Sequence, residues 1–130
     1  MTHKKIFKPM FILTIISLSQ FAYAEWVEYG QRSNGDILFF STEQQIFSGQ
    51  EAEITILANF KNARNDKSRS GSARVKLHCK EKKYQYKNFI YFSDLMAGGD
   101  VIKKVQNSQL SWKHPDRGTP YQTLFEAICK

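Results

Sequence analysis

Cys79 and Cys129 are the two cysteines of this 130-residue chain and its strongest candidates for covalent chemistry. A redox pair would favour a Cys-x-x-Cys spacing, but these residues lie about fifty positions apart in different predicted elements. Two cysteines in an exported chain most simply form one disulfide. Closing a loop of that length contributes on the order of 4 kcal/mol in the chain-entropy estimate. We therefore predict a structural disulfide.

Other reactive side chains are sparse. His78 and His114 are the only histidines after residue 24, and His78 and Cys79 are neighbours on a predicted strand, so their side chains point to opposite faces. The chain has no Gly-x-Ser-x-Gly motif, and its carboxylates are scattered singly. We predict no metal site, no cofactor and a non-enzymatic protein.

The segment KEKKYQYK, residues 80 to 87, interleaves lysines with tyrosines and is the best local candidate for an interaction surface. Its candidate partner-binding residues are Lys80, Lys82, Lys83, Tyr84, Tyr86 and Lys87. Cations and stacking rings can bind single-stranded nucleic acid, but lysines around a hairpin turn also keep a sheet edge soluble. An exported protein rarely meets nucleic acid. We expect a protein partner or a solvated turn here, and no nucleic acid.

The first 24 residues have the order of a secretory signal. Lysines precede the apolar run FILTIISL, and Ala22-Tyr23-Ala24 matches the small-x-small pattern of signal peptidase sites. We predict cleavage between Ala24 and Glu25, leaving residues 25–130 as one domain. A spanning helix needs roughly 20 apolar residues, more than this run supplies. We expect a periplasmic or secreted protein without an integral membrane segment.

The predicted mature chain is mildly basic. Without the three lysines of the signal, 16 Lys and Arg face 12 Asp and Glu, a balance of +4 rather than the +7 of the whole chain. This excess favours acidic surfaces but is too small to indicate a nucleic-acid binder.

Strand-like runs fill most of the chain. EWVEYGQ and GDILFFS are separated by Asn34-Gly35, a strong turn signal. EAEITILANF (51–60) and ARVKLHCK (73–80) alternate apolar and polar residues, which predicts strands with one buried face and turns Cys79 inward. Residues 84–92 and 101–112 are further β-prone segments. Residues 61–72 and 93–100 are predicted loops, the first of them mobile.

The C-terminal segment predicts a helix over residues 120–129. Thr119 suits the N-cap, Pro120 the first helical position, and Gln122 the third position of a capping box. Leu124, Phe125 and Ile128 form its apolar stripe. The fold class is α+β, with an antiparallel sheet of about six strands and one C-terminal helix packed on it.

Several segments together resemble the bacterial surface-adhesin protein E family. They are EWVEYG, GDILFFS leading into TEQQIFSG, SRSGSARVKLHCK and GTPYQTLFEAIC, with Trp26, Cys79, Trp112, Gly118-Thr119 and Cys129 in the expected order. The resemblance implies a small antiparallel sheet tied by a disulfide to a C-terminal helix, frequent homodimers, and binding of host matrix or plasma proteins at the cell surface.

This chain departs from the family pattern at two places. It has no cysteine after the predicted cut to carry a lipid anchor, and it has Ser41-Thr42 where the family often has Asp. We expect an exported binding protein, and association with the outer membrane surface is one of its expected locations. The homodimer expectation rests also on YQYKNFIYF, which has aromatics on both faces. The alternative is a small periplasmic ligand-binding or inhibitor protein.

Overall fold

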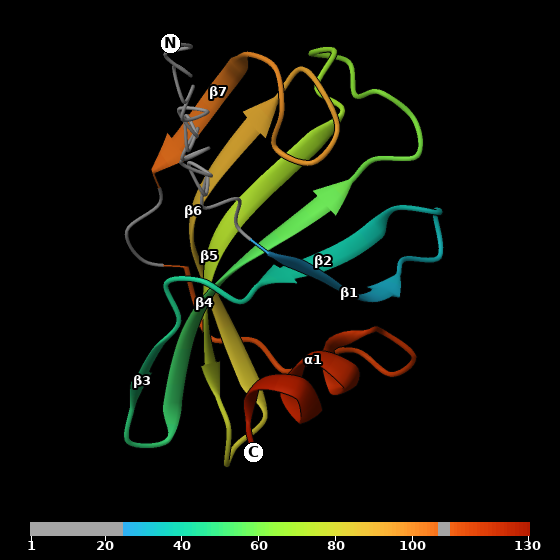
Figure 1. Ribbon diagram of the computed structural model, residues 1–130. Coiled ribbons are helices and arrows are strands. Elements are labelled where there is room, and N and C mark those ends of the chain that lie inside the picture. Colours follow the sequence, from blue (N-terminus) through green and yellow to red (C-terminus); the bar gives the residue numbers. More distant parts are fainter. Residues whose placement is uncertain (1–24, 107–109) are drawn as a thin grey trace, which may run out of the picture.

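The computed structural model describes residues 25–106 and 110–130, which form one antiparallel sheet and one helix (Figure 1). The strands are β1 (Trp26–Gln31), β2 (Ile37–Ser41), β3 (Ile46–Ser48), β4 (Glu51–Asn59), β5 (Ser70–His78), β6 (Lys83–Phe92) and β7 (Val101–Gln106). Their order is β1-β2-β4-β5-β6-β7, and β3 pairs with β4 beside β2. The predicted α+β class is confirmed. A seventh strand arises because β3, within a segment read as polar, pairs with the start of β4.

The first two strands form the predicted hairpin. Gly35 has a φ of +97°, a left-handed conformation that glycine adopts without steric cost. Its N–H donates to the Arg32 carbonyl over 2.9 Å, and the Asp36 N–H donates to the Asn34 side-chain oxygen over 3.0 Å. The Asn-Gly pair therefore fixes the turn as the sequence indicated.

The central strands β4 and β5 supply most of the core. Ile54, Val75 and Leu77 are fully buried, because period-two alternation turns them all to one face. Leu57, on the opposite face, is also buried, although alternation predicted only one buried face for this strand. Both strands are therefore central strands of the sheet, with neighbours on each edge.

The C-terminal helix α1 (Tyr121–Ile128) lies against one end of one sheet face (Figure 1). Its buried residues are the predicted Leu124, Phe125 and Ile128. The start of the helix sits against β1, where a Cβ on Gly30 would lie 2.5 Å from the Pro120 Cβ. Glycine at this position is what allows the close approach.

The predicted capping box is wrong. Pro120, rather than Thr119, precedes the first helical residue, and no side chain caps the helix. The Thr119 hydroxyl instead donates to the Asp116 carbonyl over 2.7 Å, and the Gln122 amide points along the helix to Glu126. The Thr119 hydroxyl is therefore used in the turn before the helix instead of capping the helix. Ser and Thr side chains can bond to nearby backbone groups in turns as well as at helix N-termini.

The segment 61–72 is more ordered than its polar composition predicted. β5 already begins at Ser70, and Ser68 and Ser70 are fully buried. Their hydroxyls donate to the Asp66 carboxylate over 2.6 Å and to the Asp94 carbonyl over 2.5 Å. The serines read as flexible are thus buried and hydrogen-bonded.

Candidate binding surfaces

The tyrosines of segment 80–87 are partly buried and pack against the core. Tyr84 and Tyr86 pair across the sheet with Leu77 and Val75, so they point to the face that α1 covers. The Tyr84 ring stacks on Tyr121 of the helix, with centroids 4.1 Å apart and planes 9° apart. The hydroxyls of Tyr86 and Tyr121 are hydrogen-bonded to each other.

The lysines of the same segment are distributed over different sites. Lys83 pairs with Glu81 and lies over the Trp112 ring, 5.2 Å from its centroid. Lys87 binds Glu53 on the sheet face away from the helix, over 2.6 Å. Lys82 lies over the ring of Phe125, 5.4 Å from its centroid. In a strand, successive side chains point to opposite faces. The sequence alone therefore predicts that Lys83 and Lys87 lie on the face opposite Tyr84 and Tyr86.

Glu53 is the centre of an ion network on that outer face. It accepts hydrogen bonds from Arg74 over 2.8 Å and from Lys87 over 2.6 Å. Partial burial alone would raise its pKa, but the hydrogen bonds and charges of Lys87 and Arg74 outweigh burial and lower the pKa of the carboxyl. The network ties β4, β5 and β6 together opposite the helix.

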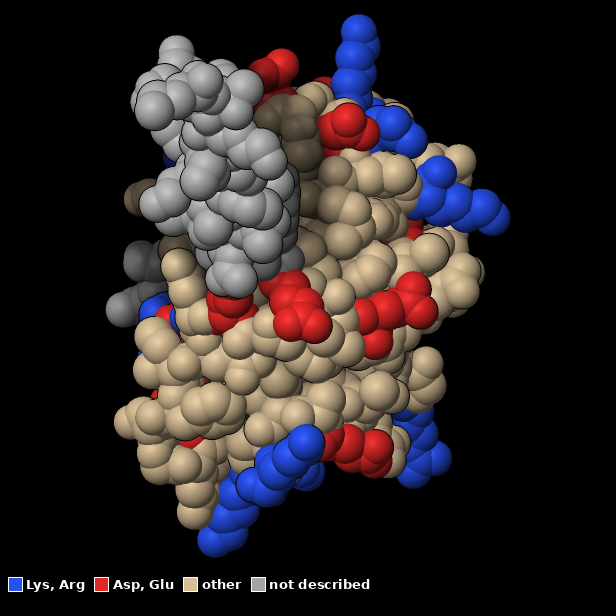
Figure 2. Space-filling view, in the orientation of Figure 1, with Lys and Arg blue, Asp and Glu red and all other residues tan. Residues whose placement is uncertain are grey.

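The disulfide between Cys79 and Cys129 is formed, with Cα atoms 5.5 Å apart. It joins the end of β5 to the end of α1. Beside it is a surface hollow of about 750 Å³ that Phe47, Lys80 and Lys130 help to line. Figure 2 shows Lys and Arg side chains at this end of the molecule with an acidic side chain between them, and others at the opposite end. Of the six predicted partner-binding residues, Lys80 is the one that faces this hollow.

Two apolar side chains of β3 are unusually exposed: Phe47 lines the hollow, and Ile46, paired with Glu53, points to the opposite sheet face. Ile46 and Phe47 on β3 are 56% and 61% exposed, more than any other large hydrophobic residue of the described chain. Both lie on a strand that sequence reasoning did not predict. The tripeptide Ile-Phe-Ser within a polar segment was its only signal.

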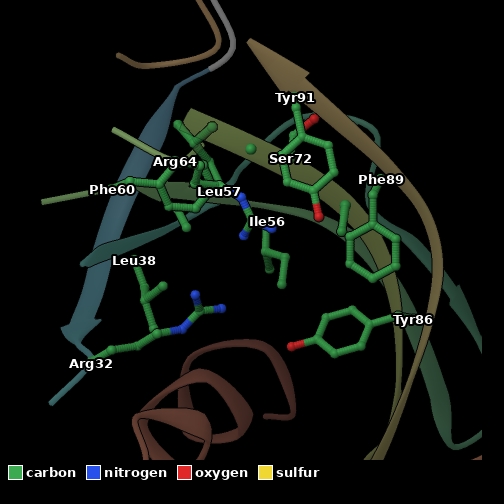
Figure 3. Close-up of a pocket in the computed structure, with 13 residues that line it drawn as sticks. Arg32, Leu38, Ile56, Leu57, Phe60, Arg64, Ser72, Tyr86, Phe89 and Tyr91 are labelled. Carbon is green, nitrogen blue, oxygen red and sulfur yellow. The ribbon is translucent and has the colours of Figure 1, made fainter. Parts of the chain in front are cut away.

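A second hollow lies on the same sheet face as α1, next to the helix (Figure 3). It is a cavity of about 230 Å³. Its apolar and aromatic lining consists of Leu38, Ile56, Leu57, Ala58, Phe60, Ala73, Tyr86, Phe89 and Tyr91. Figure 3 shows Arg32, from the β1–β2 turn, and Arg64, from the β4–β5 loop, directed into this space.

Tyr86 and the two arginines supply the polar groups of the cavity. Burial raises the pKa of Tyr86 to about 12, Tyr84 adds to the rise, and the nearby Arg32 guanidinium opposes it. The Arg64 guanidinium carbon lies 5.4 Å from the Phe60 ring centroid and 5.0 Å from that of Tyr91. Sequence reasoning missed the cavity because both arginines come from segments that read as ordinary polar turns.

The remaining predicted positions do not contribute to either hollow. The Ala24–Glu25 cleavage site lies at the border of the described residues: Ala24 is outside them, and the Glu25 carbonyl accepts the Thr42 N–H over 3.0 Å. His78 accepts a hydrogen bond from the Glu81 N–H over 3.1 Å. In the part of the chain that the structure describes, no three His, Cys, Asp or Glu side chains gather as a metal site requires.

The family model for surface-adhesin protein E matches residues 26–130. The chain belongs to the surface-adhesin protein E family. The match includes the sheet, the hollow beside the disulfide and the helix, so this family member is an adhesin-like protein. No curated protein sequence matches the chain.

Solved structures support the fold of this surface-adhesin protein E member. A crystal form II structure of Haemophilus influenzae protein E aligns with a TM-score of 0.61 and 10% identity, covering 82% of this chain and 88% of that one. Another Haemophilus influenzae protein E structure gives 0.58 and 10%, with 82% and 85% covered. At this identity the likeness shows the fold. Within residues 25–106 and 110–130, no helix has the length and apolar content needed to cross a bilayer.

Proposed function

We propose that this protein is an exported, non-enzymatic adhesin that binds a protein partner through the exposed apolar side chains of β3. The observation that supports this is the exposure of Ile46 and Phe47: Phe47 lines a hollow bordered by Lys80, Lys130 and Glu51, and Ile46 projects from the opposite face of the same strand. Exposed aromatic and aliphatic side chains with a charged rim are typical of protein-binding sites. The partner should present an apolar residue flanked by acidic ones, in keeping with host matrix or plasma proteins.

Binding by the purified exported chain to a panel of immobilised matrix and plasma proteins tests this proposal. The Ile46→Ser, Phe47→Ser double variant should reduce binding at least tenfold, because contacts of this kind contribute about 1 to 2 kcal/mol each. The matched control is Leu95→Ser, Met96→Ser, which removes two apolar side chains after β6 that are 38% and 40% exposed and lie outside every proposed surface. Equal loss in both variants, or in neither, would contradict the proposal.

Export and surface display are part of the same proposal. We expect cleavage after Ala24, so the intact mass of protein recovered from cells should begin at Glu25. Protease shaving of intact cells then distinguishes display at the outer surface from a periplasmic location. A chain that retains Met1 would oppose export by cleavage.

A homodimer is the expected oligomeric state. Within the described residues, β1 and β7 end the sheet, and Val101 and Ile102 are exposed on β7. A sheet edge with exposed apolar side chains can pair with a second copy. Sedimentation at tens of micromolar should give twice the mass of residues 25–130, and a single-chain mass throughout would oppose the dimer.

The second candidate function is that of a small periplasmic ligand-binding or inhibitor protein. The specific observation in its favour is the cavity between Arg32 and Arg64, which is separate from the β3 surface.

A further inference from the structure

We infer that the cavity lined by Arg32 and Arg64 binds a small organic anion with an apolar body, such as a single-ring aromatic carboxylate. This site goes beyond the protein binding proposed for β3. It uses different residues, on the sheet face next to the helix. Either proposal can therefore fail without the other.

Arg64 has N–H donors available to bind an anion in the cavity. None of the ion pairs among the described residues includes Arg64. Its guanidinium is held instead over the rings of Phe60 and Tyr91. Stacking on aromatic faces leaves the in-plane N–H groups available, and their fork matches the two oxygens of a carboxylate.

Arg32 also has N–H donors available to the cavity. Its one carboxylate contact, to Asp36, is long at 3.5 Å, and its side chain is 44% exposed. The Asp36 carboxylate is already bonded to the Lys61 N–H over 3.0 Å and to the Asn34 side-chain amide over 3.2 Å. A guanidinium has five N–H donors, so Arg32 retains donors for an anion in the cavity.

The walls fit a flat apolar body. Phe60 and Tyr91 stack on each other, with ring centroids 6.4 Å apart. They lie close to the strand backbone because position 71 is glycine, where a Cβ would be 3.1 Å from the Phe60 ring. Ala58 and Ala73 are the small side chains of the floor. Glycine and alanine at these positions leave space that larger residues would fill.

The volume of the cavity and the positive charge of its lining indicate which class of ligand it can bind. The volume of about 230 Å³ is below the roughly 300–1,000 Å³ of sites for drug-sized ligands, which favours a single ring or a short chain. The described residues that line the cavity include two arginines and no Asp or Glu. A largely apolar cavity with two arginines, of which Arg32 makes only a long contact to Asp36, favours an anion over a cation or a neutral molecule.

A matched pair of probes tests the class in the unmodified protein. Calorimetry and two-dimensional amide NMR should show saturable binding of 3-phenylpropionate at millimolar concentration, with shifts at the amides of Ala58, Gly71 and Ala73. The neutral 3-phenylpropanol has the same apolar body and should bind at least tenfold more weakly, because a charge-assisted hydrogen bond contributes more than a neutral one. Equal binding of the two, no binding, or shifts elsewhere would overturn the inference.

Arginine variants test the residues. Arg32→Gln and Arg64→Gln should each weaken 3-phenylpropionate binding about tenfold and leave 3-phenylpropanol unchanged. The control Arg69→Gln removes the same charge from a side chain that is 52% exposed, pairs with Asp94 and does not line the cavity. Unchanged binding in both arginine variants, or the same loss in the control, would overturn the assignment. The probe pair remains decisive if a variant fails to fold.

Discussion

The two ends of one sheet face differ in what covers them. Under α1, Ile54, Val75 and Leu77 are fully buried, and the tyrosines of β6 pack against the helix. Farther along the same strands, Ala58 and Ala73 border the arginine cavity. We call these the helix-covered half and the open half.

Element length explains the difference. α1 has eight residues, which span about 12 Å at the rise of an α-helix. β4 and β5 have nine residues each, or roughly 30 Å at the rise of a strand. One short helix therefore cannot cover the whole face. The same strands therefore supply stability at one end and room for a ligand at the other.

The largest expected effect comes from the link that holds the helix-covered half closed. Replacing Cys79 and Cys129 together by Ser should lower the free energy of unfolding by about 2 to 5 kcal/mol. Eight helical residues are too few to persist alone, so amide exchange in Tyr121–Ile128 should rise before exchange in β4. An unchanged denaturation midpoint would show that packing alone holds the helix.

A matched leucine pair compares the two halves directly. Leu77→Ala should cost near the upper part of the roughly 2 to 5 kcal/mol range, because the fully buried site under the helix cannot collapse easily. Leu38→Ala should cost near its lower part, since Leu38 already borders the open cavity. Denaturant unfolding measures both. Equal losses would mean that the open half packs as tightly as the covered one.

On the sheet face opposite the helix, the contribution of Glu53 to the free energy of unfolding should depend on pH. Glu53→Gln should cost about 1 to 2 kcal/mol at neutral pH, because it leaves Arg74 and Lys87 without their carboxylate. The folded-state pKa of Glu53 lies below the ordinary 4.5, so its contribution is present above that pH and is lost as pH falls through the folded value. Unfolding curves of the variant should therefore change less between neutral pH and pH 4. If the variant and the unmodified chain lose the same stability as pH falls, Glu53 does not cause the pH dependence.

The boundary between the halves should show the smallest effect. Tyr86→Phe removes the hydrogen bond to Tyr121 and should cost about 1 kcal/mol. Because the folded-state pKa of Tyr86 is about 12, its contribution is complete below pH 10 and is lost as pH rises from 10 toward 12. The variant should lose less stability than the unmodified chain over that window. An absorbance titration with every tyrosine ionising near pH 10 would contradict this.

Much of the fold followed from local pattern. Period two in residues 51–60 and 73–80 identified the faces of β4 and β5, the Asn34-Gly35 pair located the first turn, and the apolar spacing in residues 120–129 located the helix. With only two cysteines, the disulfide had one intramolecular solution. These features depend on residues close in sequence or on a pairing without alternatives.

Only the tertiary structure decided the surfaces. A register shift opposite Ala73 and Val75 turns both Tyr86 and Phe89 toward the same face, against strict alternation. Arg32 and Arg64 meet one cavity because β2 and β4 are paired, which places the turn after β1 and the loop after β4 at the same end of the sheet. Pairing between distant strands and the length of α1 relative to those strands are global properties, so no local pattern in the sequence contains them.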